Sequence, residues 1–213
     1  MSHYTIIELE DFMPPQHVDA IQDLLESPDI NWVFCQTTLK PYGLTKDPVW
    51  FQSLPDCEMK EKVIDTHMCV HMHFDSQGPN KERPLIMREF DCINTILLLA
   101  QQKLKFEVVE ITRVKTNLLQ NLNGFTKENH NIPHIDLYNE HYEENFSLIY
   151  YVNDSDGDTK FFNKDFELIK RVSPKKGKVV IFHSNTLHTS SNPIESPYRM
   201  VVNFNVRLKG LNN

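Results

Sequence analysis

The chain has 213 residues, of which 40% are hydrophobic and 24% charged, a composition typical of one globular domain. Its formal net charge of -7 disfavours nucleic acid as the main partner, because proteins that bind a phosphate backbone usually present a basic face. No apolar run reaches the length of a membrane span and the first residues lack the pattern of a signal peptide, so we expect a cytoplasmic protein with no membrane partner.

The cysteines carry little functional signal. Cys35, Cys57, Cys69 and Cys92 form no C-x-x-C pair, and all four lie in the first half of the chain. In a cytoplasmic protein, cysteines at such spacings are reduced thiols, and they do not predict a structural zinc site.

The first hundred residues mix strand and helix patterns. Residues 4–12 predict a short strand, and residues 14–27 predict a helix opened by two prolines. Residues 59–74 begin as a helix, and the second half of this segment fits a helix or a strand. Residues 85–104 predict another helix whose apolar residues repeat at intervals of three and four, so that one face should pack on a sheet.

From residue 106 onward, short β-rich runs are separated by turn-forming Asn, Asp, Gly and Pro. With the segment around His134 they make about eight strands with no helix between them, a pattern that predicts a sandwich or a closed antiparallel barrel, including the jelly roll. We expect a single domain over 1–213, in which 1–105 supports a β core at 106–208. The runs are "FEVVEITRVKTNLL", "SLIYYVN", "DTKFFN", "ELIKRVSP", "KVVIFH", "LHTSS" and "RMVVNFNVRL".

Two His-x-acid triplets offer candidate metal ligands. One begins at His134 and ends at Asp136, and the other begins at His141 and ends at Glu143. The first leaves room for a loop and a returning strand before Tyr151, whereas the second lies too close to that strand. We therefore expect the first triplet to bind metal and the second to lie on the following loop, at the rim of the pocket.

A third ligand has to come from the C-terminal half, which contains His183 and His188. His183 ends a buried strand, and His188 begins the next one, so His188 is the better candidate. Two histidines and one carboxylate leave one face of an octahedral metal open, and this geometry is diagnostic of non-haem Fe(II) oxygenases. Arg199 follows at the start of a strand, where its guanidinium can bind a carboxylate through two parallel hydrogen bonds.

These motifs resemble those of the 2-oxoglutarate- and Fe(II)-dependent oxygenases, and most closely their prolyl-4-hydroxylase-like branch. The resemblance covers about residues 106–208, and the sequence of its motifs is similar to that of short oxygenases of marine bacteriophages. It implies a mainly β fold: a double-stranded β-helix (jelly roll) core with N-terminal helices packed on one face. The motifs that carry it are "HID", "IYYVN", "GDTKFF", "SPKKGKVVIFHSNTLHTSS" and "RMVVNFN".

The resemblance also implies roles for individual residues. His134, Asp136 and His188 match the iron ligands that act in catalysis, and Arg199 matches the residue that binds the distal carboxylate of 2-oxoglutarate. Further cosubstrate contacts are implied for Tyr151, Thr159 and Asn117. The branch commonly has a tyrosine near the position of Asn117, but no tyrosine occurs between residues 105 and 133, so the inner contacts to the cosubstrate should differ.

The implied function is hydroxylation that consumes Fe(II)-bound 2-oxoglutarate and O2 and releases succinate and CO2, with ascorbate as a supporting reductant. We expect a prolyl or other residue of a peptide or protein as substrate, with a free amino acid or small metabolite as the alternative. If the phage resemblance holds, the site of action is the host cytoplasm. The sequence sets no oligomeric state.

Two other interpretations remain. A cupin-like, non-catalytic module could use the same barrel to bind a metal or ligand, although it would have no need of Arg199. A second cluster, His67, His71 and His73, could also bind metal, but no carboxylate or cysteine arrangement completes a clear site, so a pocket-rim or structural role is the better interpretation.

Overall fold

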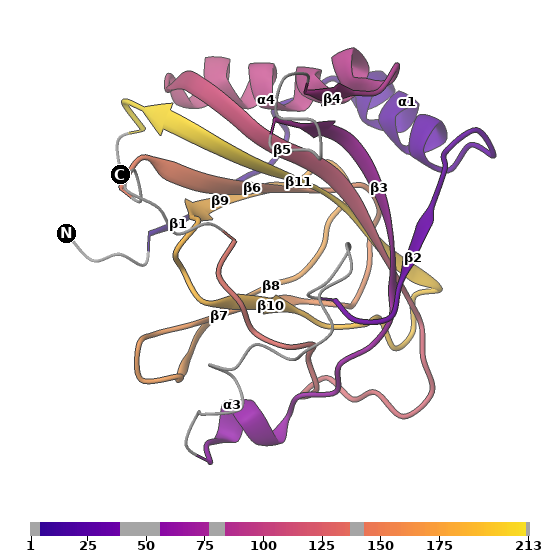
Figure 1. Ribbon diagram of the computed structural model, residues 1–213, viewed down its shortest axis with the longest axis vertical. Helices are drawn as coiled ribbons and strands as arrows, with labels where there is room; N and C mark the ends of the chain where they lie inside the picture. The colour runs from indigo at the N-terminus through magenta and orange to yellow at the C-terminus, as the bar shows by residue number, and fades with distance from the viewer. Residues whose placement is uncertain (1–4, 39–55, 77–83, 137–142, 212–213) are drawn as a thin grey trace.

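The structure, a computed structural model, describes residues 5–38, 56–76, 84–136 and 143–211. Two antiparallel sheets face each other, and two helices cover the outer side of the larger sheet (Figure 1). The described part of the chain contains no helix long and apolar enough to span a membrane. The helices are α1 (Pro15–Leu25), α3 (Glu58–Glu61) and α4 (Phe90–Leu104).

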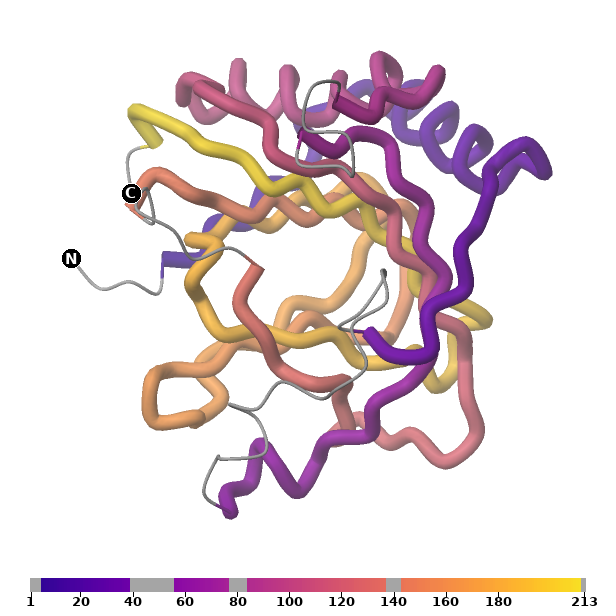
Figure 2. The backbone as a smooth tube through the Cα atoms, in the orientation of Figure 1, coloured from indigo at the N-terminus to yellow at the C-terminus, as the bar shows by residue number. Residues whose placement is uncertain are grey.

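The larger sheet draws strands from both halves of the chain, and the smaller one comes from the second half alone (Figure 2). In order across the larger sheet lie β1 (Ile6–Leu9), β9 (Val179–His183), β6 (Asn145–Tyr151), β11 (Tyr198–Lys209), β5 (Glu107–Gln120), β3 (Met68–Asp75) and β2 (Val33–Cys35), with β4 (Leu85–Ile86) paired to β3. The smaller sheet has the order β10 (His188–Ser190), β7 (Thr159–Phe162) and β8 (Leu168–Val172).

The central strands of the larger sheet are buried on both faces, which explains their nearly continuous apolar sequence. In β6, Leu148 and Tyr150 pack toward the helices with Ile93 of α4, while Ile149 and Tyr151 pack toward the smaller sheet. This alternation lets one strand serve two cores. The predicted jelly roll with helices on one face is confirmed.

The predicted helix at 14–27 forms α1, but the helix predicted at 85–104 begins only at Phe90. Leu85 and Ile86 instead form β4, in which Ile86 pairs with Phe74 of β3. The apolar spacing was continuous across both elements, and only the pairing with β3 separates them. The ambiguous segment at 59–74 divides similarly into α3 and most of β3.

The side chains of His71 and His73 point to the same side of β3 and meet Glu89 beneath α4. One carboxylate oxygen of Glu89, Oε1, lies 2.6 Å from His71 Nε2 and 3.0 Å from His73 Nδ1. The remaining ring nitrogens also have partners, since His71 Nδ1 donates to the Asn31 carbonyl at 2.9 Å and His73 Nε2 lies 2.7 Å from Thr116 Oγ1. Contrary to the expectation from sequence, a carboxylate thus completes a set of three potential metal ligands, whose ligand atoms lie within 4.8 Å of one another. Because both imidazoles lie at hydrogen-bond distance from one Glu89 oxygen, the arrangement also fits a structural network.

Replacing Glu89 with alanine should destabilise the fold by about 3 kcal/mol, because it leaves two buried imidazoles without their shared acceptor. Chemical denaturation followed by circular dichroism measures this loss. The control is Glu110→Ala on β5, which removes an exposed partner of Arg207 and should cost less than about 1 kcal/mol. Equal effects of the two substitutions would mean that the Glu89 network does not contribute to stability.

Candidate active site

The structure brings His134, Asp136 and His188 together at one end of the space between the sheets. The backbones of His134 and His188 pair with each other, with N–O distances of 2.9 Å and 3.0 Å. The Asp136 amide donates to the Ser184 carbonyl at 2.9 Å, which anchors the carboxylate beside the two imidazoles. Backbone pairing therefore sets the positions of all three side chains.

The three side chains each direct one potential ligand atom to a common point, and these atoms lie within 4.8 Å of one another. His134 Nε2 and His188 Nε2 each lie 3.7 Å from a different oxygen of Asp136. The Nδ1 atoms face the backbone carbonyls of Ile132 and Thr186, at 3.3 Å and 2.9 Å. An Nδ1 that donates to a carbonyl leaves the lone pair of Nε2 free, which is the tautomer that metal-binding histidines adopt.

The electrostatic surroundings keep His134 and Asp136 in their ligand forms. Burial lowers the pKa of His134 to about 4, so its imidazole is neutral at neutral pH. Burial alone would raise the pKa of Asp136, but His188, His134 and Arg113 together with a hydrogen bond from Ser147 hold it well below its usual value. Ser147 Oγ donates to Asp136 Oδ2 at 2.6 Å. Two imidazoles and one ionised carboxylate fit a divalent metal such as Fe(II).

A buried cation lies in the same space, away from the three potential ligands. Arg199 is 2% exposed, and it donates through Nε to the Gly157 carbonyl at 2.7 Å and through Nη2 to Thr159 Oγ1 at 2.8 Å. Thr159 Oγ1 in turn lies 2.7 Å from the Tyr151 hydroxyl. Position 157 requires glycine, since a Cβ there would lie 2.5 Å from the Ser191 carbonyl oxygen. The structure thus brings Tyr151, Thr159 and Arg199 together, while their role in binding 2-oxoglutarate stays a prediction.

Among the described residues, no carboxylate forms an ion pair with Arg199. A buried guanidinium without a counter-ion is costly, so this end of the space fits the carboxylate of a ligand. The cavity between the two ends also contains two buried oxygens without hydrogen bonds, Asn117 Oδ1 and Asn203 Oδ1. It is lined by Thr38, Met68, Lys115, Asn117, Leu119, His134, Ile149, Thr159, His188, Thr189, Ser190, Arg199, Val201 and Asn203.

Several residues around this cavity were not singled out from the sequence. Lys115 lines the cavity, and Asn203 Nδ2 donates to Asp136 at 3.3 Å. Arg113 donates to Asn205 Oδ1 through two nitrogens, at 3.0 Å and 2.7 Å. In the sequence, these residues were indicated by the alternation of polar residues in "RVKTN" and "NFN". In a strand, such alternation places every second side chain on the inner face of the sheet.

The rival histidines do not join this cluster. The ring of His183 packs on Phe146, with ring centroids 4.3 Å apart, at the end of β9. His141, in the second His-x-acid triplet, lies outside the described residues, while Glu143 is described but belongs to no cluster of potential metal ligands. None of the four cysteines forms a disulfide, and none belongs to such a cluster in the described part of the chain.

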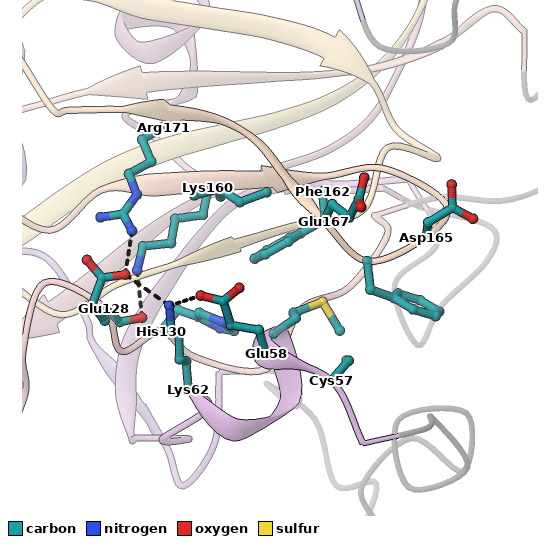
Figure 3. A pocket seen from close by; sticks show the side chains of 13 residues that line it. Cys57, Glu58, Lys62, Glu128, His130, Lys160, Phe162, Asp165, Glu167 and Arg171 are labelled. Carbon is teal, nitrogen blue, oxygen red and sulfur yellow. Dashed lines mark hydrogen bonds and ion pairs between the residues drawn. The ribbon is translucent and has the colours of Figure 1, made fainter.

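A separate surface pocket of about 590 Å³ lies beside α3, β7 and β8 (Figure 3). Its charged side chains largely satisfy one another, as Figure 3 shows for Glu128, which pairs with Lys62 at 3.2 Å and with Arg171 at 2.7 Å. Lys160 Nζ donates to three backbone carbonyls, at distances between 2.9 Å and 3.0 Å. This pocket contains none of the predicted site residues.

Comparison with known proteins identifies the family to which this arrangement is related. Residues 120–207 match the model of the 2OG-Fe(II) oxygenase superfamily, where 2OG denotes 2-oxoglutarate. No curated protein sequence gives a significant match to the chain. The predicted resemblance to the 2-oxoglutarate/Fe(II) oxygenases is thus confirmed over these residues, while the resemblance to phage proteins stays a prediction.

Solved structures share the fold. A Burkholderia pseudomallei oxidoreductase of the 2OG-Fe(II) oxygenase family aligns with a TM-score of 0.61 at 13% identity, covering 95% of this chain and 84% of that one. A Pseudomonas putida prolyl-4-hydroxylase gives 0.52 at 14%, covering 98% and 95%. A Trichoplax adhaerens prolyl hydroxylase in complex with a hypoxia inducible factor peptide gives 0.58 at 11%, covering 95% and 83%. At these identities the likeness shows the fold alone.

Proposed function

We propose that this oxidoreductase, an Fe(II)- and 2-oxoglutarate-dependent oxygenase, hydroxylates a prolyl or other residue of a peptide or protein and releases succinate and CO2. The observation that carries the proposal is the cavity itself, which has a 2-His-1-carboxylate cluster at one end and, at the other, the buried Arg199, which forms no ion pair with any described residue. The proposal includes a single domain over 1–213, which is supported by the larger sheet, since the segments 1–105 and 106–208 both contribute strands to it.

His134, Asp136 and His188 would hold the iron, and Ser147 and Asn203 would fix the orientation of the Asp136 carboxylate. When bound, iron(II) supplies the redox chemistry that couples oxidative decarboxylation of 2-oxoglutarate by O2 to hydroxylation of the substrate. Ascorbate would serve as a supporting reductant. The protein's own contribution is to position these groups and to keep the site dry.

Arg199 would bind the distal carboxylate of 2-oxoglutarate, since its guanidinium is buried and has hydrogen-bond donors to spare. Thr159 and Tyr151 would hold the guanidinium and contact the same carboxylate. Burial raises the pKa of Tyr151 to about 12, so its hydroxyl keeps its proton and can donate it to a ligand oxygen. Asn117 would face the cosubstrate from β5, where its amide NH2 can donate to a ligand oxygen.

The substrate class rests on analogy with the prolyl-4-hydroxylase and with the prolyl hydroxylase solved with a peptide. A free amino acid or small metabolite is the alternative substrate. A cupin-like, non-catalytic module is disfavoured, because such a module has no use for a buried arginine across the cavity from the metal. A cytoplasmic site of action stays a prediction.

The substrate is tested with a peptide library presented to the iron-loaded enzyme with 2-oxoglutarate, in parallel with a panel of free amino acids. We expect a mass gain of one oxygen on a peptide, with one succinate formed per hydroxylation, and no gain with His188→Ala. A gain found only among the free amino acids would replace the peptide proposal with the small-molecule alternative.

A further inference from the structure

Lys115 places a second buried cation in the proposed active site. It lies in β5 with its side chain toward the smaller sheet, directly across from Asn203 of β11 in the strand register. Only 7% of the residue is exposed, and it lines the cavity together with His134 and Asn117. Lys115 lies close enough to the candidate metal ligands to interact electrostatically with both His134 and Asp136.

The Lys115 ammonium has neither a hydrogen bond nor an ion pair among the described residues. Asp136 attracts it through space but is already engaged by Ser147 and Asn203. Burial lowers the pKa of Lys115 to about 8, so the group is still largely protonated at neutral pH. A buried ammonium without a counter-ion costs free energy that a bound anion would recover.

The surroundings of Lys115 are polar and incompletely hydrogen-bonded. Among the described residues, Asn203 Oδ1 and Asn117 Oδ1 are both buried without hydrogen-bond partners, and their side chains lie on the same face of the sheet as Lys115. These amide oxygens are acceptors that an anion cannot satisfy, so the charge of the buried Lys115 ammonium is what indicates a carboxylate ligand at this wall.

We propose that Lys115 binds the carboxylate at the oxo-acid end of 2-oxoglutarate, the end that would face the iron. This inference rests on the proposed function and adds a contact that the predicted site residues do not supply. In the register between β5 and β11, Lys115 pairs with Asn203, and Arg199 pairs with Leu119 four positions further along β5. The two cations therefore lie at opposite ends of the cavity, as a dicarboxylate requires.

The test compares 2-oxoglutarate with 2-oxopentanoate, which keeps the oxo-acid end but lacks the distal carboxylate. Binding is measured anaerobically on the Fe(II)-loaded protein by calorimetry. Lys115→Met should weaken both ligands about tenfold or more, whereas Arg199→Met should weaken 2-oxoglutarate alone. Lys115→Arg, which keeps the charge, should retain most of the affinity for both ligands.

A second measurement separates ligand binding from a structural role. Without ligand, Lys115→Met should be at least as stable as the wild type, because the ammonium has no protein partner to lose. Unchanged affinity of Lys115→Met for both ligands, while the wild type binds 2-oxoglutarate, would overturn the inference and leave the proposed function intact. Failure of the wild type to bind 2-oxoglutarate would overturn both.

Discussion

Replacing Asp136 with alanine should lower succinate production from 2-oxoglutarate by more than about a hundredfold, since changes even to residues that only orient metal ligands cost 10–100-fold. The carboxylate is the sole anionic donor in the cluster, and it lies 3.7 Å from the Nε2 atoms of both His134 and His188. Without it, only the two imidazoles of the cluster remain to hold a divalent cation. The readout is succinate formed per enzyme under air.

The fold should survive this substitution, because the larger sheet and its helical core do not depend on Asp136. Circular dichroism of Asp136→Ala should match that of the wild type. The matched control is Asp165→Ala, which removes an exposed carboxylate in the turn between β7 and β8 and should leave succinate production unchanged. Wild-type turnover by a folded Asp136→Ala protein would show that the cluster does not hold the catalytic metal.

Replacing Arg199 with alanine should weaken 2-oxoglutarate binding about a hundredfold, while iron binding persists. The guanidinium is buried, and two parallel charged hydrogen bonds to a carboxylate are worth roughly 3 kcal/mol or more, which corresponds to this factor. Since the loss is in binding, succinate production should recover partly at saturating 2-oxoglutarate. Anaerobic titration of the iron-loaded variant measures the affinity.

The control for Arg199 lies on the same strand. Arg207 is more exposed and pairs with Glu110 at 3.1 Å, so Arg207→Ala removes an arginine from β11 without touching the cavity. It should leave the affinity for 2-oxoglutarate unchanged. If Arg199→Ala binds 2-oxoglutarate as tightly as Arg207→Ala does, then Arg199 has no part in cosubstrate binding.

Much of the β core was predictable because its strands have strong local patterns. The runs "LIYY" and "VVIF" are apolar on both sides, which is what a strand between two cores requires. The helix predicted at 85–104 was too long by its first five residues, because apolar spacing cannot show that Leu85 and Ile86 pair with β3. The local sequence pattern thus predicted which helices and strands form better than it predicted the residues at which they begin and end.

The candidate site was predictable where a short motif places a residue, and less so where only the fold does. The choice of His134 over His141 followed from the distance to the next strand, and the structure places His134 beside His188. Lys115 and Asn203 look like ordinary alternating polar residues in the sequence. Their inward direction and lack of partners depend on packing between strands that are distant in the chain.

The network of His71, His73 and Glu89 is a second case in which the sequence does not show a contact between distant segments. In the sequence, the two histidines of "HMH" could have been metal ligands, and Glu89 is far enough away to be overlooked. The packing of α4 on β3 brings the carboxylate to both rings, where hydrogen bonds to a single oxygen satisfy them. Only the tertiary contact distinguishes a structural role from a metal site.

Anaerobic titration of the apoprotein with Fe(II) in the presence of 2-oxoglutarate tests the central claim most directly. We expect a weak visible charge-transfer band that saturates at about one iron per chain, as a single 2-His-1-carboxylate site requires, and that disappears in His188→Ala. A wild-type protein that gives no such band, or a band that persists unchanged in His188→Ala, would contradict the account.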